Sequence, residues 1–392
     1  MTNNLRNYFL ITGGYWAFTL TDGAIRMLVV LFFHQLGYSP LEVASLFIFY
    51  EFFGIVTNLL GGWMASRLGL NVTMHLGMAL QIVALLMLTV SHEALTIIYV
   101  MFAQALSGIA KDLNKMSAKA SVKTLLSKDS DAALFKWVAI LTGSKNALKG
   151  AGFFLGAFLL QIAGFQNALF ILAGGLSLAL LITFILLPNK LGKAKNKVKF
   201  TQIFSNIPDI NWLSAARFFL FGARDIWFVI ALPVFLYDKL NWSFTEVGTF
   251  IALWIIGYGI AQASTPTLLR RHLPTGKSAS LLALLLAVIP AFIALSLLQE
   301  WNPNFVIVIG LLIFGLVFAV NSATHSYLIL AYSAHDKVAL NVGFYYMANA
   351  GGRLTGTILS GLIYQQYGLV GCLVASSGFV FIAGILSLRL KN

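Results

Sequence analysis

The chain is divided into apolar stretches of about twenty residues, and several of them carry a charged side chain near the middle. A stretch of about 20 apolar residues is long enough to cross a bilayer as a helix. A charge at the centre of such a helix costs about 2.5 to 3.5 kcal/mol on insertion scales, so buried charges mark an ion or substrate path. We therefore expect a membrane protein that moves a charged cargo. The charged positions are Asp22, Arg26, Glu51, Lys145, Lys149, Arg224, Asp225 and Arg353.

The composition excludes a soluble domain. Of 392 residues, 59% are hydrophobic and 10% are charged, with a mean hydropathy of +0.85, which leaves too little polar surface. The opening residues lack the cationic region and cleavage site of a secretory signal, so we expect residues 8–36 to remain as a first span. The single cysteine, Cys372, excludes a disulfide framework or a multi-thiol metal site within one chain. We expect no metal and no cofactor.

Apolar windows predict twelve transmembrane helices in an all-α integral membrane protein. With the amino terminus inside, 19 of the 26 lysines and arginines fall in or near cytoplasmic connections, among them Lys111, Lys115, Lys119 and Lys123. This asymmetry predicts that both termini are cytoplasmic and that the chain is a multi-pass protein of the plasma (inner) membrane. The predicted spans are 8–36, 41–65, 71–90, 95–115, 134–162, 167–187, 211–237, 246–269, 278–298, 305–332, 338–363 and 369–388.

The net charge of +13 and a pI near 9.8 do not indicate a nucleic-acid partner. The basic residues lie in connections that flank spans, where they face anionic lipid, and no nucleic-acid-binding module is visible. The lipid bilayer is the expected partner, and we expect a monomer. No nucleophile constellation is visible either, and the sequence Gly276-Lys277-Ser278 lacks the glycine and the strand of a phosphate-binding loop. We therefore expect a chain that is not an enzyme.

The sequence contains a duplication. A shift of 204 residues aligns residues in connections and in spans, which predicts two pseudo-symmetric six-helix bundles at 1–187 and 211–392, joined by a basic linker at 188–210. Parallel repeats of this kind are typical of major facilitator transporters, whose substrate site lies near the membrane midplane. The aligned residues are Ser39, Glu42, Val43, Arg67, Lys149, Gly152, Gln161 and Gly164 with Ser243, Glu246, Val247, Arg271, Arg353, Gly356, Gln365 and Gly368.

The segment that follows the second predicted span resembles the loop signature of the major facilitator superfamily. It reads Gly61-Gly62-Trp63-Met64-Ala65-Ser66-Arg67-Leu68-Gly69. Ser66 replaces the acidic residue of the signature, and Leu70 replaces its later basic residue. The twelve spans, the repeat and this segment together predict the major facilitator fold.

Longer stretches resemble one branch of that superfamily, the organoarsenical efflux permeases of the ArsJ type. These stretches are Arg6 to Arg26, Lys111 to Lys119 and Leu141 to Gly150. The resemblance implies export of 1-arseno-3-phosphoglycerate, which forms in the cytoplasm when glyceraldehyde-3-phosphate dehydrogenase uses arsenate in place of phosphate. Because the ester falls apart outside the cell, the transporter and this dehydrogenase would act as a functional pair that confers arsenate resistance. The resemblance supplies no site residues.

The charges within the spans favour an oligoanionic cargo. Away from the span ends there are six cations and three acids, a surplus of three; they are Arg26, Lys145, Lys149, Arg217, Arg224 and Arg353 against Asp22, Glu51 and Asp225. A guanidinium can hold two oxygens of a phosphate or arsenate, whereas lysine acts as a point charge. Arg26 and Arg224 lie on equivalent helices of the two halves, and pseudo-symmetry predicts that both face one central cavity. Lys145 and Lys149 share a helix face. The predicted substrate-binding cations are Arg26, Lys145, Lys149, Arg224 and Arg353, and organophosphate antiporters of the superfamily offer an analogy.

Structural ion pairs are the alternative use of these charges. Asp22 is one turn from Arg26, and Asp225 can neutralise Arg217 or Arg224, whereas no acid is close to Lys149 in the sequence. Glu51 is the first candidate for a proton-coupling carboxylate, followed by Asp22 and Asp225. His34 and His325 could also titrate near neutrality. Near the midplane, Gln104, Tyr258, Gln262 and Asn321 could bind hydroxyl groups, although helix-to-helix hydrogen bonding is the commoner use of such residues.

Three other functions stay open at this point. The first is an exporter or antiporter of another organophosphate or organic anion. The second is a proton-driven multidrug exporter, for which unpaired acids rather than a surplus of cations are expected. The third is a membrane sensor that transports nothing. Trivalent arsenic is disfavoured as a cargo because it is held by thiolates, and Cys372 alone cannot supply a pair.

Overall fold

A computed structural model describes residues 3–38, 43, 45–126, 131–188, 205–242, 244–269, 272–334 and 337–391. Helix accounts for 88% of it, and the described part of the chain contains no strand, which confirms the predicted all-α class. The chain divides into two compact units. Unit 1 consists of Met1–Trp137, Ser144–Phe204 and Ser333–Met347, and unit 2 of Val138–Gly143, Ser205–Tyr332 and Ala348–Asn392.

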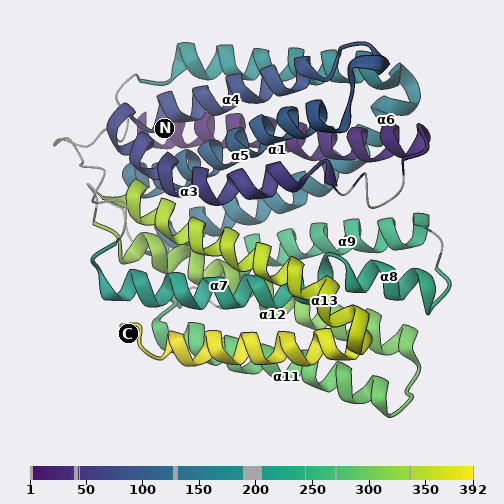
Figure 1. Ribbon diagram of the computed structural model, residues 1–392. Helices are drawn as coiled ribbons and strands as arrows, with labels where there is room; N and C mark the ends of the chain where they lie inside the picture. Colours follow the sequence, from purple (N-terminus) through teal and green to yellow (C-terminus); the bar gives the residue numbers. More distant parts are fainter. Residues whose placement is uncertain are drawn as a thin grey trace. The chain divides into compact units, whose positions relative to one another are not determined.

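Unit 1 is a bundle in which α5 is central. Helix α5 packs against α1, α3 and α4, as Figure 1 shows. Its long helices are α1 (Asn3–Gln35), α3 (Ile48–Leu68), α4 (Leu70–Met87), α5 (Ile97–Leu126) and most of α6 (Asp131–Leu186), and the 3-10 turn η1 (His92–Ala94) lies between α4 and α5.

Aromatic rings and aliphatic side chains form the core at one end of unit 1. The rings of Phe32 in α1 and Phe165 in α6 are stacked with their centroids 3.9 Å apart, and Phe33 meets Phe32 edge to face. Leu46 and Leu169 are fully buried in the same cluster. This packing joins α1 to the second part of α6.

Two helices are interrupted at a glycine with positive φ. Helix α6 has 56 residues and contains Gly164 at φ 75°, and α13 (Val338–Ser387) has 50 residues and contains Gly368 at φ 60°. At 1.5 Å per residue, either helix would be more than twice, at about 2.5 to 2.8 times, as long as the ~30 Å bilayer core. Glycine adopts positive φ readily because it has no Cβ. The interruptions lie where the sequence predicts the ends of adjacent spans.

Unit 2 is organised around α12, which contacts α7, α9 and α11. Local sequence sets the helix starts: the Thr275 side chain and Ser278 form a capping box on α11, and Asn302 caps α12 ahead of Pro303. The helices are α7 (Pro208–Phe228), α8 (Ala231–Asp238), α9 (Phe244–Ala263), α10 (Thr265–Leu268), α11 (Gly276–Leu298), α12 (Pro303–Ala331) and α13 from residue 348 onward.

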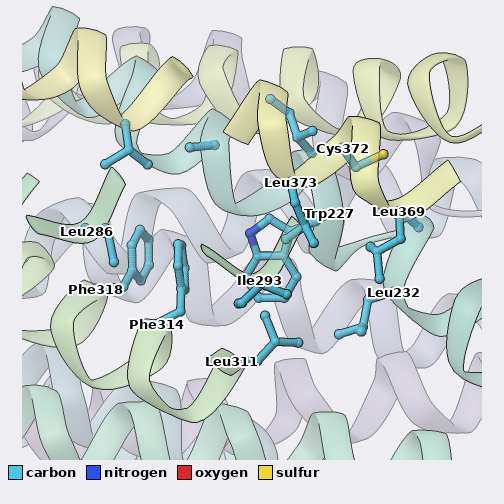
Figure 2. Packing of buried hydrophobic residues seen from close by; sticks show 14 of the residues in the cluster. Trp227, Leu232, Leu286, Ile293, Leu311, Phe314, Phe318, Leu369, Cys372 and Leu373 are labelled. Carbon is cyan, nitrogen blue, oxygen red and sulfur yellow. The ribbon is translucent and has the colours of Figure 1, made fainter. Parts of the chain in front are cut away.

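The core of unit 2 surrounds Trp227 of α7 (Figure 2). Its ring meets Phe314 edge to face with the centroids 5.1 Å apart. The neighbouring Trp254 donates a hydrogen bond of 2.8 Å from Nε1 to the carbonyl oxygen of Leu311. Cys372 is buried in the same cluster, where it packs as a small core residue.

Nine helices in the described part of the chain are long and apolar enough to cross a membrane. Helices α6 and α13 each count once in that number, and α5 is not included although the sequence predicts a span at 95–115. The total of twelve spans, the cytoplasmic termini and the domain boundaries at 187 and 211 stay predictions.

Several residues used in the sequence analysis lie outside the described residues. They are Ser39, Glu42, Ser243, Arg270, Arg271, Lys128 and the linker residues 189–204 with Lys190, Lys193, Lys195, Lys197 and Lys199, together with the side chain of His34.

Candidate functional site

A buried ion pair joins α1 to α6 in unit 1. The Oδ2 atom of Asp22 lies 3.1 Å from Nζ of Lys149. The hydroxyl of Tyr50 in α3 donates a hydrogen bond of 2.6 Å to Oδ1 of the same carboxylate. Both oxygens of Asp22 are therefore engaged. The absence of an acid near Lys149 in the sequence was misleading, because the partner comes from another helix.

Glycines allow α1 and α6 to approach closely at this pair. A Cβ atom on Gly23 would lie 2.6 Å from the carbonyl oxygen of Lys149, and one on Gly152 would lie 2.6 Å from that of Leu20. These distances are too short for any side chain. The small residues that the sequence places near Lys149 thus bring its ammonium within reach of Asp22.

Arg26 pairs with Glu51 of α3 and not with Asp22, the acid one turn away on its own helix. The Arg26 Nη1 atom lies 3.8 Å from Oε1 of Glu51, and both side chains are about a third exposed, at 32% and 31%. The guanidinium also lies over the ring of Phe47, 4.9 Å from its centroid. This pair is longer and more accessible than the Asp22–Lys149 pair, so it is the easier of the two to open.

In unit 2, one carboxylate is shared by two arginines. Asp225 of α7 is fully buried, and its Oδ1 accepts a hydrogen bond of 2.7 Å from Nε of Arg224. Its Oδ2 accepts one of 3.0 Å from Nε of Arg353 in α13. Arg217 donates to Asn349 Oδ1 at 2.9 Å instead of pairing with Asp225. Two guanidinium groups therefore lie against a single carboxylate.

The two ion pairs occupy corresponding positions of the sequence repeat. Each joins an acid in the first helix of one half to a cation about 130 residues later, with separations of 127 for Asp22 and Lys149 and 128 for Asp225 and Arg353. The cations are 204 residues apart and the acids 203. Because the acids are one residue out of register with the repeat, the shift by 204 did not reveal them as equivalent.

Unit 2 also shares the close helix approach seen in unit 1. A Cβ atom on Gly356 would lie 2.4 Å from the carbonyl oxygen of Gly222, and one on Gly352 would lie 2.1 Å from that of Phe218. Gly356 corresponds to Gly152 of unit 1 in the repeat. In both units the same sequence pattern of glycines beside a cation produces the same contact between helices.

The predicted polar midplane residues differ in their contacts. Gln262 donates a hydrogen bond of 3.0 Å to Ser322 Oγ, and Tyr258 is stacked on Trp254 with the centroids 5.8 Å apart. Gln104 and Asn321 are fully buried, and their amide atoms have no hydrogen-bond partner among the residues that the structure describes. Lys145 lies one turn before Lys149 on α6 and is partly buried.

The sequence analysis placed three lysines of α5 in or near cytoplasmic connections and did not include them among the candidate site residues. Lys111, Lys115 and Lys119 lie within the helix and are partly or fully buried, with Lys119 only 2% exposed. Hydropathy counts their charge but ignores the helix face on which it lies. Their spacing of four residues was the available signal, since residues at i and i+4 share one face.

A pocket of about 460 Å³ lies beside Gly368 in unit 2 and contains none of the predicted site residues. Its lining includes Phe235, Lys239, Trp301 and Tyr364. Within the described ranges, no group of three His, Cys, Asp or Glu residues lies close enough together to hold a metal ion.

Solved structures with the same fold cover almost the whole chain. The human organic anion transporter MFSD10 aligns at a TM-score of 0.78 and 17% identity over 99% of this chain and 100% of its own. A bacterial homologue of the iron transporter ferroportin, in its outward-facing state, aligns at 0.78 and 16% over 98% of both chains. The E. coli fucose:proton symporter aligns at 0.74 and 11% over 99% of both.

At these identities the structural neighbours establish the fold alone. No curated protein sequence matches the chain. The sequence profile of the Major Facilitator Superfamily matches residues 11–329 and 213–392, which together span most of the chain. The chain therefore belongs to the Major Facilitator Superfamily, a family of multi-pass membrane transporters.

Proposed function

We propose that this transporter exports an organic oxyanion, and that its cargo is an organophosphate-like ester such as 1-arseno-3-phosphoglycerate. The observation that carries the proposal is the sharing of Asp225 by Arg224 and Arg353. Two guanidinium groups that share one carboxylate can exchange it for the oxygens of an anionic cargo. Planar guanidinium groups match the oxygens of phosphate and arsenate in pairs, which a lysine ammonium cannot do.

The three candidate proton-coupling acids are each accompanied by a cation, which disfavours export of lipophilic cations. Asp22, Glu51 and Asp225 each lie within 4 Å of a lysine or arginine nitrogen. A carrier of cations needs a carboxylate that the cargo can neutralise, whereas here that charge is already balanced. An anionic cargo instead competes with the carboxylates for their cations. The organic anion transporter among the similar structures adds an analogy at the level of fold.

The Arg26–Glu51 pair supports a way to couple transport to protons. It is the most accessible of the three acid–cation pairs, and its charged atoms are 3.8 Å apart. An anion that draws Arg26 away leaves Glu51 in a less favourable setting for its charge, so that the carboxylate takes up a proton. Release of the anion restores the pair and expels the proton. Asp22 and Asp225, which have closer partners, remain the second candidates for this role.

The cations proposed to bind cargo are Arg26, Lys145 and Lys149 in unit 1 and Arg224 and Arg353 in unit 2, and the proposed hydrogen-bonding groups for hydroxyls are Gln104 in unit 1 and Tyr258, Gln262 and Asn321 in unit 2. Asn321 and Gln104 suit that role best because their buried amides have no partner among the described residues. A polar ligand or water would satisfy them.

Uptake into everted membrane vesicles tests the proposal directly. Vesicles that contain the chain are supplied with radiolabelled 3-phosphoglycerate, or with arsenate, glyceraldehyde-3-phosphate, NAD and the dehydrogenase, which generate the arsenic ester in place. We expect uptake of the ester with the wild type and at least a tenfold reduction with R353Q. A K136Q variant, which alters an exposed lysine of unit 1, is the matched control and should transport normally.

The substrate is tested by growth in arsenate. An arsenate-sensitive host that expresses the chain should gain resistance only when the dehydrogenase is also expressed. Transport of 3-phosphoglycerate without any gain in resistance would instead favour another organophosphate as the cargo. Absence of all anion uptake by abundant, correctly inserted protein would contradict the proposal and favour a sensor.

A further inference from the structure

Tyr50 of α3 contacts charged side chains from three other helices of unit 1, and the function proposed above gives it no role. The residue is buried, with 2% of its surface exposed. Its backbone lies so close to α5 that a Cβ atom on Gly108 would be 2.5 Å from the Tyr50 carbonyl oxygen. The glycine therefore allows α3 to place Tyr50 directly against α5.

The ring of Tyr50 is close to three cations. The Nζ atom of Lys111 in α5 lies 3.8 Å from the ring centroid, and that of Lys149 in α6 lies 6.0 Å from it. The guanidinium carbon of Arg26 in α1 lies 5.5 Å from the same centroid. Aromatic faces attract cations within about 6 Å without neutralising them. The ring therefore offsets part of the repulsion that separates three like charges.

The hydroxyl of Tyr50 contacts an acid instead. It donates a hydrogen bond of 2.6 Å to Oδ1 of Asp22, whose Oδ2 lies 3.1 Å from Nζ of Lys149. Tyr50 and Lys149 are the two side-chain partners of this carboxylate within the described ranges. A buried carboxylate that loses its last partner is strongly unfavourable. Tyr50 thus supplies Asp22 with a partner that stays in place when Lys149 moves.

The cations are more accessible than the groups that hold them. The side chains of Arg26, Lys111 and Lys149 are 32%, 15% and 20% exposed, whereas that of Asp22 is 4% exposed. An entering anion therefore touches the cations, while the acid and the ring of Tyr50 are covered. The other two cations each lie 3.8 Å from a different carboxylate, so only Lys149 shares its acid with Tyr50.

We infer that Tyr50 is a positioning residue of the anion site in unit 1. Its ring holds Arg26, Lys111 and Lys149 near one another, and its hydroxyl retains Asp22 when an anion draws Lys149 away. Tyr50 acts through these charges and not through contact with the cargo, so it lowers the cost of reorganising the site. The inference rests on the proposed function, since it takes the cargo to be an organic oxyanion, and it adds Lys111 to the site.

The role of the hydroxyl is tested by binding of inorganic phosphate and 3-phosphoglycerate to the purified full-length chain in detergent, measured by isothermal titration calorimetry. Y50F keeps the ring but leaves Asp22 without a partner once Lys149 moves, so we expect affinity to fall about tenfold. In a D22N background no charge is left to retain, so Y50F should change affinity by less than about twofold. Such a double-mutant cycle isolates the coupling between Tyr50 and Asp22.

The role of the ring is tested with two further variants in the same assay. Y50L removes the aromatic face as well as the hydroxyl, so we expect it to weaken binding about threefold more than Y50F does. K111Q removes the cation closest to the ring and should weaken binding of both probes about threefold or more. Binding by Y50L that equals binding by Y50F would contradict the role of the ring.

Y8F is the matched control. Tyr8 of α1 is also 2% exposed, and its hydroxyl donates a hydrogen bond of 3.2 Å to the carbonyl oxygen of Trp137. Y8F therefore removes the same atom from another buried tyrosine of unit 1 and should bind both probes as the wild type does. Thermal melting of all variants identifies any that are misfolded. If D22N is unstable, the comparison of Y50F with Y8F still decides.

The outcomes separate this inference from the proposed function. Unchanged affinity in Y50F overturns the inference, even if the chain transports organophosphates, and a lower melting temperature alone would indicate a structural role. Equal losses from Y50F with and without D22N also overturn it. A loss in Y50F that disappears in the D22N background supports it, even if vesicles show no organophosphate transport. Failure of the wild type to bind either probe overturns the inference, and vesicle uptake then decides separately on the proposed function.

Discussion

The ion pairs of the two units have the same location in the repeat but different chemistry. In unit 1 the carboxylate of Asp22 is shared between one lysine and a tyrosine hydroxyl. In unit 2 the carboxylate of Asp225 is shared between two arginines. The first carboxylate contacts one cation and the second contacts two. The duplication has thus kept the contact between helices, while the number and type of the cations on the acid differ between the units.

The largest effect is expected for removal of the shared acid in unit 2. D225N leaves Arg224 and Arg353 without their carboxylate, and loss of one partner of a buried pair typically costs about 3 to 5 kcal/mol. D22N leaves only Lys149 unpaired, and lysine can lose its proton when it is buried, so a smaller loss is expected. Thermal melts of both variants in one detergent measure the difference. Equal losses would show that the two units are energetically alike.

Exchange of the two cation types sharpens the comparison. R353K keeps the charge but loses the planar fork, so we expect a loss of transport of about tenfold or more, which corresponds to about 1.4 kcal/mol. K149R should retain most transport because Asp22 is bound there through a single contact. Vesicle uptake at equal protein abundance measures both. A K149R defect as severe as that of R353K would contradict the assignment of two-oxygen recognition of the anion to the arginines of unit 2.

The close helix approach is expected to matter equally in both units. G152A and G356A would each place a Cβ atom within 2.6 Å of a backbone carbonyl oxygen of the neighbouring helix. Overpacking of this kind typically costs about 1 to 3 kcal/mol. G174A, at a helical glycine with nothing within 4 Å of its Cβ position, is the matched control and should be neutral or slightly stabilising. Thermal melting distinguishes the three variants.

The smallest effect on stability is expected for E51Q. Accessible ion pairs typically contribute about 0 to 1 kcal/mol, so the melting temperature should hardly change. Transport should nevertheless lose its dependence on a pH gradient, while exchange of anion for anion continues. Uptake with and without an imposed gradient measures this. If E51Q still accumulates anion in response to the gradient, the coupling role passes to Asp22 or Asp225.

The sequence predicted the features that depend on local composition. Apolar length located the helices, and Gly164 and Gly368 lie where adjacent spans were expected to separate. The shift of 204 residues aligned Gly152 with Gly356, and both lie at a close approach of two helices. Each of these features follows from residues close together in the chain, so periodicity and residue size suffice to find it.

The partners of the charges could not be predicted, because they depend on how helices cross. Asp22 forms its ion pair with Lys149, which is 127 residues away, and not with Arg26 on its own helix. The lysines of α5 were placed in or near connections, and not among the site residues, because hydropathy averages a segment over all of its faces. A helix with one charged side and one apolar side is invisible to such an average, even when the charged side is buried against other helices.

In α6 and in α13, a glycine joins two helical segments without the flexible loop that usually connects successive helices. The two segments on either side of the glycine are called arms below. At Gly164 and at Gly368, a single residue with positive φ separates one arm from the next. When one arm tilts, the other must tilt with it, because only the φ and ψ torsions of the glycine can change between them. Each of these two joints therefore acts as a short mechanical link, and an insertion there should uncouple the arms.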